Sequence, residues 1–156
     1  MTQQMTVVLG PGQGAQAVGM GKAWAAASPA AKAIFDQADA VLGDRLGATL
    51  SQLCFEGPAD QLNQTNVSQP AIYTCSVASH AGIVEVAGEV GASAAAGLSL
   101  GEYTALHLAG VFDFETGLEL VARRGRLMQD AAESSSGSMV ALMGADESEA
   151  VELCKD

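Results

Sequence analysis

The chain has 156 residues, of which 49% are hydrophobic and 4% aromatic, and its formal net charge is −11 at pH 7. This length and composition predict one folded domain with its own core and exclude a fibrous or disordered chain. The negative charge argues against binding to nucleic acid or to an anionic membrane surface, because both attract clustered Lys and Arg.

The three cysteines, Cys54, Cys75 and Cys154, are odd in number and share no metal-ligand spacing. They predict buried, reduced thiols of a cytoplasmic protein, with neither a disulfide framework nor a metal site. No basic residue precedes Lys22, so we expect no secretory signal. The uncharged run 61–84 contains Gln, Asn, Ser and His, which excludes a membrane span there.

The first half of the chain predicts one strand followed by helices. The apolar run 5–9 stops at the sequence GPGQG and predicts a buried strand. Ser28 as N-cap, Pro29 in the first helical position and Gly43 after the last periodic residue delimit a helix. A short helix is expected to open at Pro58 and a longer one at Pro70. The apolar face expected for the longer helix consists of Ile72, Tyr73, Val77, Ile83 and Val84.

The segment 92–96 has two competing predictions. Its alanines favour a helix by propensity, whereas the G-x-S-x-G spacing that follows requires a strand that runs into a sharp turn. We predict the strand. Helices are expected from Ser99 to about Ala109, and from an N-cap at Asp113 to about Ala132.

The end of the chain continues the alternation of strands and helices. Residues 133–138 (ESSSGS) predict a loop, and 139–143 (MVALM) predict a strand. Asp146 and Glu149 have the spacing of a capping box and predict a helix start. No stop signal precedes Asp156, so we expect a chain cut within a strand–helix unit. Strands alternating with helices predict an α/β protein.

The sequence GLSLG at 97–101 has the spacing of a nucleophile elbow. Glycines two before and two after Ser99 remove side chains that would obstruct a strained turn between strand and helix. Such a turn sets the serine hydroxyl at a helix N-terminus, which favours developing negative charge. The pattern also arises by chance in glycine-rich chains. Its place after a small apolar run and before a helix favours Ser99 as a nucleophile.

The sequence GPGQGAQ at 10–16 follows the first predicted strand. Its backbone N–H groups are candidates to hold an oxyanion, and an ordinary tight turn is an equal alternative. A dinucleotide site is disfavoured, because Pro11 interrupts the pattern and Asp36 lies beyond the expected acidic position. A Walker motif fails at Ala23, which follows Lys22.

Three of the seven basic residues fall within the sequence ARRGRLMQ. On a helix, Arg123 and Arg126 face away from the apolar side, and Glu119 is placed to pair with Arg123 four residues later. Arg124 lies on an apolar sector and needs an anionic partner. That partner is either a structural Asp or Glu, or the carboxylate of a substrate held by the guanidinium fork.

A serine nucleophile needs a base, and the chain has two histidines. His107 lies eight residues after Ser99, about 12 Å along the same predicted helix, and cannot reach its hydroxyl. His80 shares a helix face with Tyr73 and Val77, which predicts a packed core or rim histidine. The sequence therefore contains no convincing base.

Together, PGQGAQ, SQPAIYT, GLSLGEYTAL, AGVFDFE and RRGRLMQ resemble the family of malonyl-CoA:acyl-carrier-protein transacylases of bacterial fatty-acid synthesis, which are related to the acyltransferase domains of polyketide synthases. The resemblance runs from Val7 to the predicted strand after Gly137. It implies an α/β-hydrolase-like core with a parallel sheet and a smaller ferredoxin-like subdomain. Residues 1–133 would form the N-terminal part of the core, and 134–156 the incomplete start of the subdomain.

The resemblance also implies roles for individual residues. Ser99 would be acylated by malonyl-CoA and would pass the malonyl group to the phosphopantetheine thiol of acyl carrier protein. Gln13 and the backbone N–H of Leu100 would stabilise the oxyanion. Arg124 would hold the malonyl carboxylate, and Gln69 of SQPA would lie near the pocket. No metal or cofactor of the protein's own is implied.

Two departures from the family pattern matter. Leu98 stands where the family usually has histidine, a change that concerns the pocket. The family's base histidine lies downstream of the region that this chain resembles, so we expect the chain alone to turn over malonyl-CoA very slowly or not at all. A serine hydrolase with the same elbow and a non-catalytic truncated scaffold or carrier-binding domain are the alternatives. The choice among malonyl and other extender units and the oligomeric state stay open.

Overall fold

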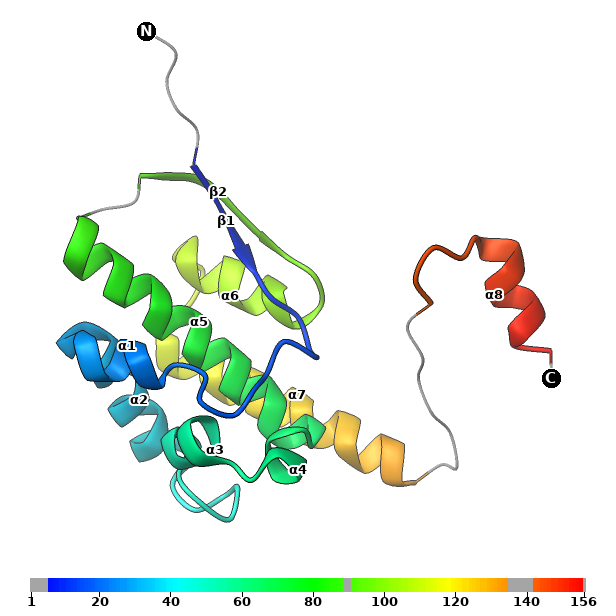
Figure 1. Ribbon diagram of the computed structural model, residues 1–156, viewed down its shortest axis with the longest axis horizontal. Coiled ribbons are helices and arrows are strands. Elements are labelled where there is room, and N and C mark those ends of the chain that lie inside the picture. Colours follow the sequence, from blue (N-terminus) through cyan, green and yellow to red (C-terminus); the bar gives the residue numbers. More distant parts are fainter. Residues whose placement is uncertain (1–5, 89–90, 135–141, 156) are drawn as a thin grey trace, which may run out of the picture.

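Two parallel strands, β1 (Thr6–Gly10) and β2 (Ala92–Gly97), lie side by side at one end of a layer of helices (Figure 1). The structure is a computed structural model that describes residues 6–88, 91–134 and 142–155. Val7 of β1 is opposite Ala94 of β2, and Leu9 is opposite Ala96. These four side chains share one face and are all exposed, so no described residue covers this face of the sheet.

Eight helices belong to the described part of the chain. They are α1 (Lys22–Ala27), α2 (Pro29–Leu42), α3 (Leu50–Glu56), α4 (Ala59–Leu62), α5 (Thr65–Ala87), α6 (Leu100–Leu108), α7 (Phe114–Glu133) and α8 (Glu147–Leu153). Helix α6 packs against both strands, and α5 lies between α2 and α7. No residue of α8 is buried, and Figure 1 shows this helix apart from the others. None of the helices described is long and apolar enough to cross a membrane.

The core is centred on α5 and on the helices that pack against it. Tyr73 of α5 is fully buried, and its ring stacks on Phe114 of α7 with the centroids 5.6 Å apart. Gly117 permits this contact, because a Cβ there would lie 2.1 Å from the Tyr73 hydroxyl. Phe35 and Leu118 are also buried, and each large apolar side chain removed from water contributes about 1.5–3 kcal/mol. This packing fixes α7 against α5.

Most of the predicted elements are confirmed. Strand β2 and the first strand form, and the predicted helices appear as α2, α4, α6, α7 and α8 with boundaries within a residue or two. The prediction that the first strand is buried is wrong for the described structure, because no residue of β1 is buried and Val7 and Leu9 are exposed. The Ser28 Oγ accepts from the N–H of Ala31 at 3.0 Å, as expected of an N-cap before Pro29. Asp146 and Glu149 form the predicted capping box of α8.

The predicted start of the longest helix is wrong. Helix α5 begins at Thr65 and includes Pro70 as an interior residue. The Gln64 carbonyl accepts from the N–H groups of Val67 and Ser68, so a helical turn is already formed before the proline. Residues 67–74 are all buried, and this packing offsets the hydrogen bond that proline cannot donate. Tertiary contacts therefore override the local signal.

Other expectations met mixed outcomes. Sequence reasoning missed the short helices α1 and α3. In the predicted strand 139–143, residues 139–141 lie outside the described residues, and Leu142 and Met143 are not in a strand. Residues 135–138 of the predicted loop also lie outside the described residues. On α5, Ile72, Tyr73 and Val77 are buried as expected, whereas Ile83 is exposed.

The cysteines are unpaired, as expected, but not all are buried. Cys54 is buried, Cys75 is partly buried and Cys154 is exposed. The expectation of buried thiols is therefore wrong for Cys154. This residue follows α8, a helix that contributes nothing to the described core.

Candidate active site

Ser99 lies at the turn between β2 and α6, where the sequence predicts a nucleophile elbow. Its backbone has φ 55° and ψ −101°, and it is the one non-glycine residue with positive φ in the parts of the chain described. L-residues with side chains avoid this conformation, at a cost of order 1–3 kcal/mol. Strain of this kind persists where the surroundings determine the turn, and it marks Ser99 as a candidate functional residue.

Glycines around the turn let three stretches of backbone meet. A Cβ on Gly97 would lie 2.2 Å from the carbonyl carbon of Gly101, and a Cβ on Gly101 would lie 2.2 Å from the carbonyl oxygen of Gly10. These are backbone atoms, which no rotamer change can move away. The glycine contact of Gly10, Gly97 and Gly101 therefore locks the elbow onto the end of β1.

The N-terminus of α6 is directed towards the elbow. Glu102 accepts a hydrogen bond from the backbone N–H of Ser99 at 2.9 Å, which holds the strained residue. Leu100 is the first residue of the helix, and N–H groups of a first turn have no intrahelical acceptor. The backbone N–H of Leu100 is therefore a candidate donor beside the serine hydroxyl.

Arg124 reaches Ser99 from α7. Its Nη2 donates to Ser99 Oγ at 2.8 Å and its Nη1 donates to Gln69 Oε1 of α5 at 2.7 Å. The guanidinium carbon lies 5.7 Å from the centre of the Tyr103 ring, within the range of a cation–π contact. The next residue of α7, Gly125, allows this approach, because a Cβ there would lie 2.8 Å from the Thr65 carbonyl oxygen.

No Asp or Glu pairs with Arg124 in the part of the chain that the structure describes. The partners of this half-buried cation are a neutral amide and a neutral hydroxyl. Hydrogen bonds of a guanidinium to a carboxylate are stronger than those to neutral acceptors. A structural acid as partner, one of the two sequence alternatives, is thus excluded within this part of the chain.

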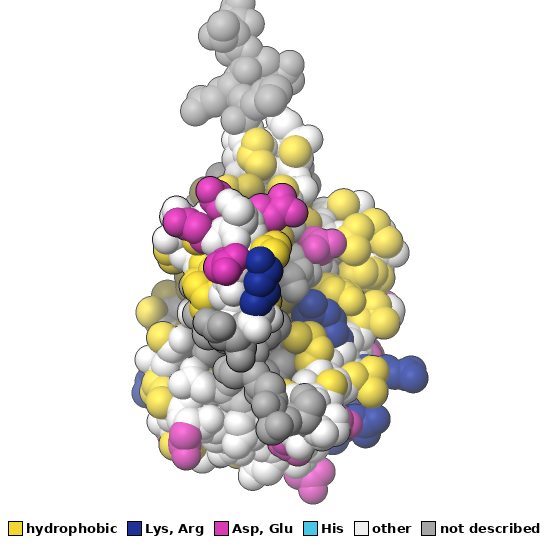
Figure 2. Space-filling view, turned by 90° about the vertical axis from the view of Figure 1, so that its right-hand side faces the viewer, with side chains coloured by type: hydrophobic (Ala, Val, Ile, Leu, Met, Phe, Trp, Pro, Cys, Tyr) yellow, Lys and Arg dark blue, Asp and Glu magenta, His cyan; other side chains and the backbone are white. Residues whose placement is uncertain are grey.

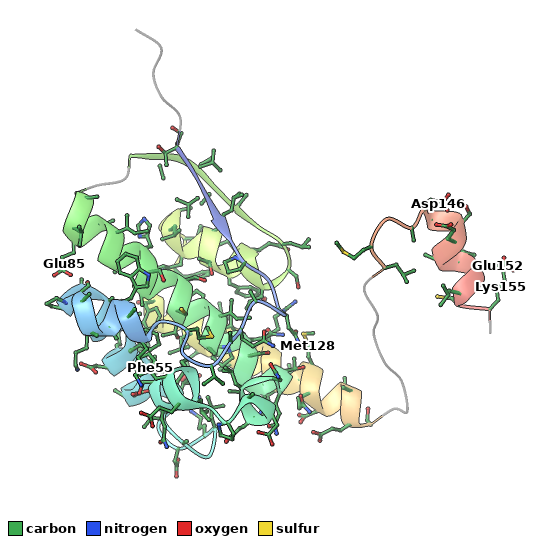
Figure 3. All side chains as sticks on the ribbon, viewed as in Figure 1. Phe55, Glu85, Met128, Asp146, Glu152 and Lys155 are labelled. Atoms are coloured by element: carbon green, nitrogen blue, oxygen red, sulfur yellow. The ribbon has the colours of Figure 1, made fainter. Side chains whose placement is uncertain are left out.

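Gln69 connects Arg124 to the loop after β1. It is fully buried, and its Nε2 donates to Met128 Sδ at 3.1 Å and lies 3.5 Å from Gln13 Oε1. The Nε2 of Gln13 in turn donates to Thr65 Oγ1 at 3.2 Å. Figure 3 labels Met128 on α7, where that helix passes the loop after β1. The predicted residues Gln13, Gln69, Arg124 and Ser99 therefore form one continuous network.

The loop after β1 also contacts the elbow through its backbone. A Cβ on Gly12 would lie 3.3 Å from the Leu98 carbonyl oxygen. This contact places Gln13 close to the elbow. The Leu98 side chain is 81% exposed, next to the nucleophile and open to solvent.

Sequence reasoning missed three residues of this network. Thr65 and Tyr103 carry no local signal, because only the folded contacts bring them to Gln13 and Arg124. Met128 falls on the apolar face of α7, a pattern that predicts core packing and not a contact with a polar amide.

Neither histidine hydrogen-bonds to Ser99 in the described structure. His107 Nδ1 lies 3.2 Å from the Phe112 carbonyl oxygen, and its ring packs edge-on against Tyr73. His80 lines an apolar groove between α5 and β1. His80 therefore has the packing role that the sequence predicts, and His107, as expected, does not contact the serine hydroxyl. The residues described contain no group of three or more His, Cys, Asp or Glu able to hold a metal ion.

Comparisons with known proteins agree with this geometry. The model of the acyl transferase domain family matches residues 7–156. The malonyl CoA-acyl carrier protein transacylase of Escherichia coli K12 is 42% identical over 146 residues, which cover 94% of this chain and 46% of that protein. The chain thus spans about half the length of the relatives it matches.

Solved structures give the same result. The malonyl CoA-acyl carrier protein transacylase of Coxiella burnetii superposes with a TM-score of 0.85 and 36% identity, over 97% of this chain and 46% of that one. A malonyl-transacylase in complex with its type II polyketide acyl-carrier protein gives a TM-score of 0.74 and 41% identity, over 83% of this chain and 40% of that one. The elbow, its arginine and these matches together show that the chain belongs to the acyl transferase domain family.

Proposed function

We propose that this chain is the nucleophile-bearing part of an enzyme that transfers a malonyl group from coenzyme A to an acyl carrier protein. The observation that carries the proposal is the contact between Ser99 Oγ and a guanidinium without a carboxylate partner among the described residues. Relatives that act as malonyl CoA-acyl carrier protein transacylases, and one solved together with its carrier protein, support the choice of donor and acceptor.

The proposed reaction has two half-reactions at Ser99. The Oγ attacks the thioester carbonyl carbon, the carbon–sulfur bond breaks, and the serine proton passes by way of a base to the departing coenzyme A sulfur. The carrier thiol then attacks the acyl-serine ester and restores the serine hydroxyl. The backbone N–H groups of Leu100 and Gln13 are the proposed oxyanion donors, each worth a few kcal/mol. This chemistry needs no cofactor of the protein's own.

Arg124 is the proposed partner of the free malonyl carboxylate. A carboxylate can accept two parallel hydrogen bonds from the guanidinium, which is a stronger arrangement than a bond to the serine hydroxyl. Binding of the acyl group would thus move Nη2 from Ser99 Oγ to the carboxylate and leave the hydroxyl available for attack. Gln69, through its bond to Nη1, would hold the guanidinium in position.

The base of the proposed reaction is a histidine in the part of the family fold that this chain does not span. Residues 1–133 would belong to an α/β-hydrolase-like core, and 134–156 to the start of a ferredoxin-like subdomain. The uncovered face of Val7 and Leu9 supports a larger sheet, because parallel strands are usually covered on both faces. We place the complete enzyme in the cytoplasm.

The test is a chimera that joins this chain to the second half of the Escherichia coli transacylase. Malonyl transfer to a carrier protein, and a malonyl adduct on the peptide containing Ser99, are expected from the chimera and not from the chain alone. Ser99→Ala should abolish both, whereas Ser93→Ala, at an exposed position of β2, should abolish neither. Full transfer by the unfused chain would disprove the assignment of the base.

Hydrolysis is the second candidate, because Ser99 is exposed to solvent in the structure. A serine hydrolase would release free malonate at the same rate with or without carrier protein. A transferase would release free malonate slowly, and it would form malonyl-carrier protein faster than it releases malonate. Measuring both products from the chimera separates the two functions.

A further inference from the structure

A hollow of about 370 Å³ lies on the side of α7 away from the elbow, between the end of α2 and the start of α5. Its polar lining consists of Arg45, Asn66, Glu119, Arg123 and Arg126, and the rest is apolar. Residues two positions apart on a helix point about 200° apart, so Arg126 and Arg124 face opposite sides of α7. We call this hollow the arginine pocket.

One of the three arginines is already neutralised. Arg45 donates to both carboxylate oxygens of Glu119, at 2.9 Å from Nη1 and 2.6 Å from Nη2. It also donates to the carbonyl oxygens of Leu42 and Val41, at the C-terminus of α2. Arg45 and Glu119 therefore form a fixed, uncharged wall of the pocket.

This arrangement corrects the sequence prediction that Glu119 pairs with Arg123. Because Arg45 takes the carboxylate, neither Arg123 nor Arg126 has an ion pair in the described part of the chain. The lining carries three arginines and one glutamate, a net charge of +2 on a chain whose net charge is −11. On the face seen in Figure 2, dark-blue Lys and Arg side chains lie mainly on the right, with others near the centre and at the left edge.

Asn66 adds to the preference for negative charge. It is the second residue of the long helix α5, so the positive end of that helix lies at the pocket. Its side-chain oxygen is buried without a partner in the structure as described, but this oxygen is a hydrogen-bond acceptor and does not itself attract an anion. The pocket thus offers two guanidinium groups, those of Arg123 and Arg126, that have no ion pair among the described residues and can donate hydrogen bonds.

We propose that the arginine pocket binds a phosphate-bearing ligand, as a phosphomonoester or a diphosphate group. Guanidinium groups bind phosphate oxygens through two parallel hydrogen bonds, and the volume falls in the range of small-ligand pockets. Such a group can come from free phosphates or, if the proposed function holds, from the nucleotide part of coenzyme A. Arg126 is the stronger anchor, because Arg123 also borders a hollow lined by Asp113 and Glu115.

The test measures binding to the 156-residue chain by calorimetry at low salt. The probes are inorganic pyrophosphate, adenosine 3′,5′-bisphosphate and pantetheine, which lacks phosphate. We expect saturable binding of both phosphate probes, no binding of pantetheine, and weakening by added salt. Tighter binding of the bisphosphate would assign the pocket to the coenzyme A nucleotide, and equal or tighter binding of pyrophosphate would assign it to free phosphates.

Variants assign the binding to the pocket. Arg126→Gln should weaken phosphate binding about tenfold, and Arg123→Gln should weaken it less. Lys32→Gln combined with Lys155→Gln removes two positive charges elsewhere and should leave the affinity unchanged; unaltered circular dichroism would show that each variant is folded. Absence of saturable binding, or equal weakening in the lysine variant, would overturn the proposal. Because the readout is binding alone, failure of the transfer assay would not affect it.

Discussion

Arg124 Nη2 lies 2.8 Å from Ser99 Oγ, although the two residues are 25 positions apart, Ser99 at the turn before α6 and Arg124 within α7. The guanidinium is therefore within reach of the far end of any short acyl group carried by the serine. A malonyl ester ends in a carboxylate only two carbons beyond the carbonyl, so both ends of this group fit between the two side chains. This relationship leads to the first prediction.

Arg124→Ala in the chimera should reduce malonyl transfer by about one to two orders of magnitude, because it removes charge-assisted hydrogen bonds to the carboxylate. Acetyl transfer should not fall in parallel, since an acetyl group has no carboxylate. The measurement is kcat/KM for both thioesters. Lys32→Ala, at an exposed helix position, is the matched control. Equal loss with both substrates would refute the role of Arg124.

Gln69→Glu should raise KM for malonyl-CoA and leave acetyl transfer nearly unchanged. The new carboxylate would lie where the amide oxygen now accepts from Arg124 Nη1 at 2.7 Å, and it would neutralise the cation that the substrate needs. Gln69→Leu should instead destabilise the fold by about 1–3 kcal/mol, because it leaves Nη1 of the half-buried Arg124 without its acceptor. Steady-state kinetics and urea unfolding distinguish these outcomes. An unchanged KM in Gln69→Glu would contradict the proposed positioning.

Gly101→Ala should destabilise the chain by at least about 1–3 kcal/mol, since the added Cβ would lie 2.2 Å from the Gly10 carbonyl oxygen. Gly12→Ala should cost less, because its Cβ would lie 3.3 Å from the nearest atom. Urea unfolding of the two variants checks the order. A Gly101→Ala chain as stable as the parent would show that the strand and the elbow separate more easily than the contact indicates.

The sequence identified most helices because their ends carry local chemistry. Ser28, Asp113 and Asp146 all accept backbone hydrogen bonds at helix starts, as their positions predict. The start of α5 escaped prediction because its N-cap residue, Gln64, makes no side-chain cap. The N–H of Thr65 instead donates to Gln129 Oε1 of α7, a contact 64 positions away that no local pattern indicates. Strand β2 was the harder choice, and the glycine spacing gave the right answer where alanine propensity favoured a helix.

The candidate site was predictable in its residues but not in its connections. Ser99, Gln13, Gln69 and Arg124 stand in recognisable motifs, yet nothing local shows that Gln69 bridges two of them. Arg45 was invisible as the partner of Glu119, because it is 74 positions away and competes with a nearer arginine on the same helix. Long-range pairs of this kind depend on the packing of α2 against α7.

The pair of Arg45 and Glu119 should make stability depend on pH. The hydrogen bond from Arg45 lowers the pKa of the Glu119 carboxyl, and slight burial opposes this. The stabilisation is therefore complete above the unfolded pKa, about 4.3, and is lost as pH falls through the lower folded pKa. Both side chains are about half exposed, so we expect no more than about 1 kcal/mol.

The measurement for this pair is the free energy of unfolding between pH 3 and pH 7. Glu119→Gln should reduce the free energy of unfolding at neutral pH. It should also make that free energy fall less steeply as the pH is lowered. Glu115→Gln, one helical turn earlier, removes a carboxylate that is not a partner of Arg45 in the described structure. Identical pH profiles for the parent and Glu119→Gln would show that the pair contributes nothing.

The three thiols should differ in reactivity towards iodoacetamide in the folded protein. Burial raises the pKa of Cys54 and of Cys75, so little thiolate forms at either residue at neutral pH. Cys154 is exposed and should be alkylated first. Peptide mass spectrometry after brief labelling checks this order, and urea should make all three reactive. Early labelling of Cys54 would indicate that the core opens more readily than its packing suggests.

The bare face of the sheet, with Val7 and Leu9 opposite Ala94 and Ala96, has a practical consequence. Unpaired strand edges beside exposed apolar side chains are templates for joining other strands. Purified by itself, this chain should self-associate through β1 and β2 as its concentration rises. A fusion or co-expressed segment that covers these strands should keep it dispersed.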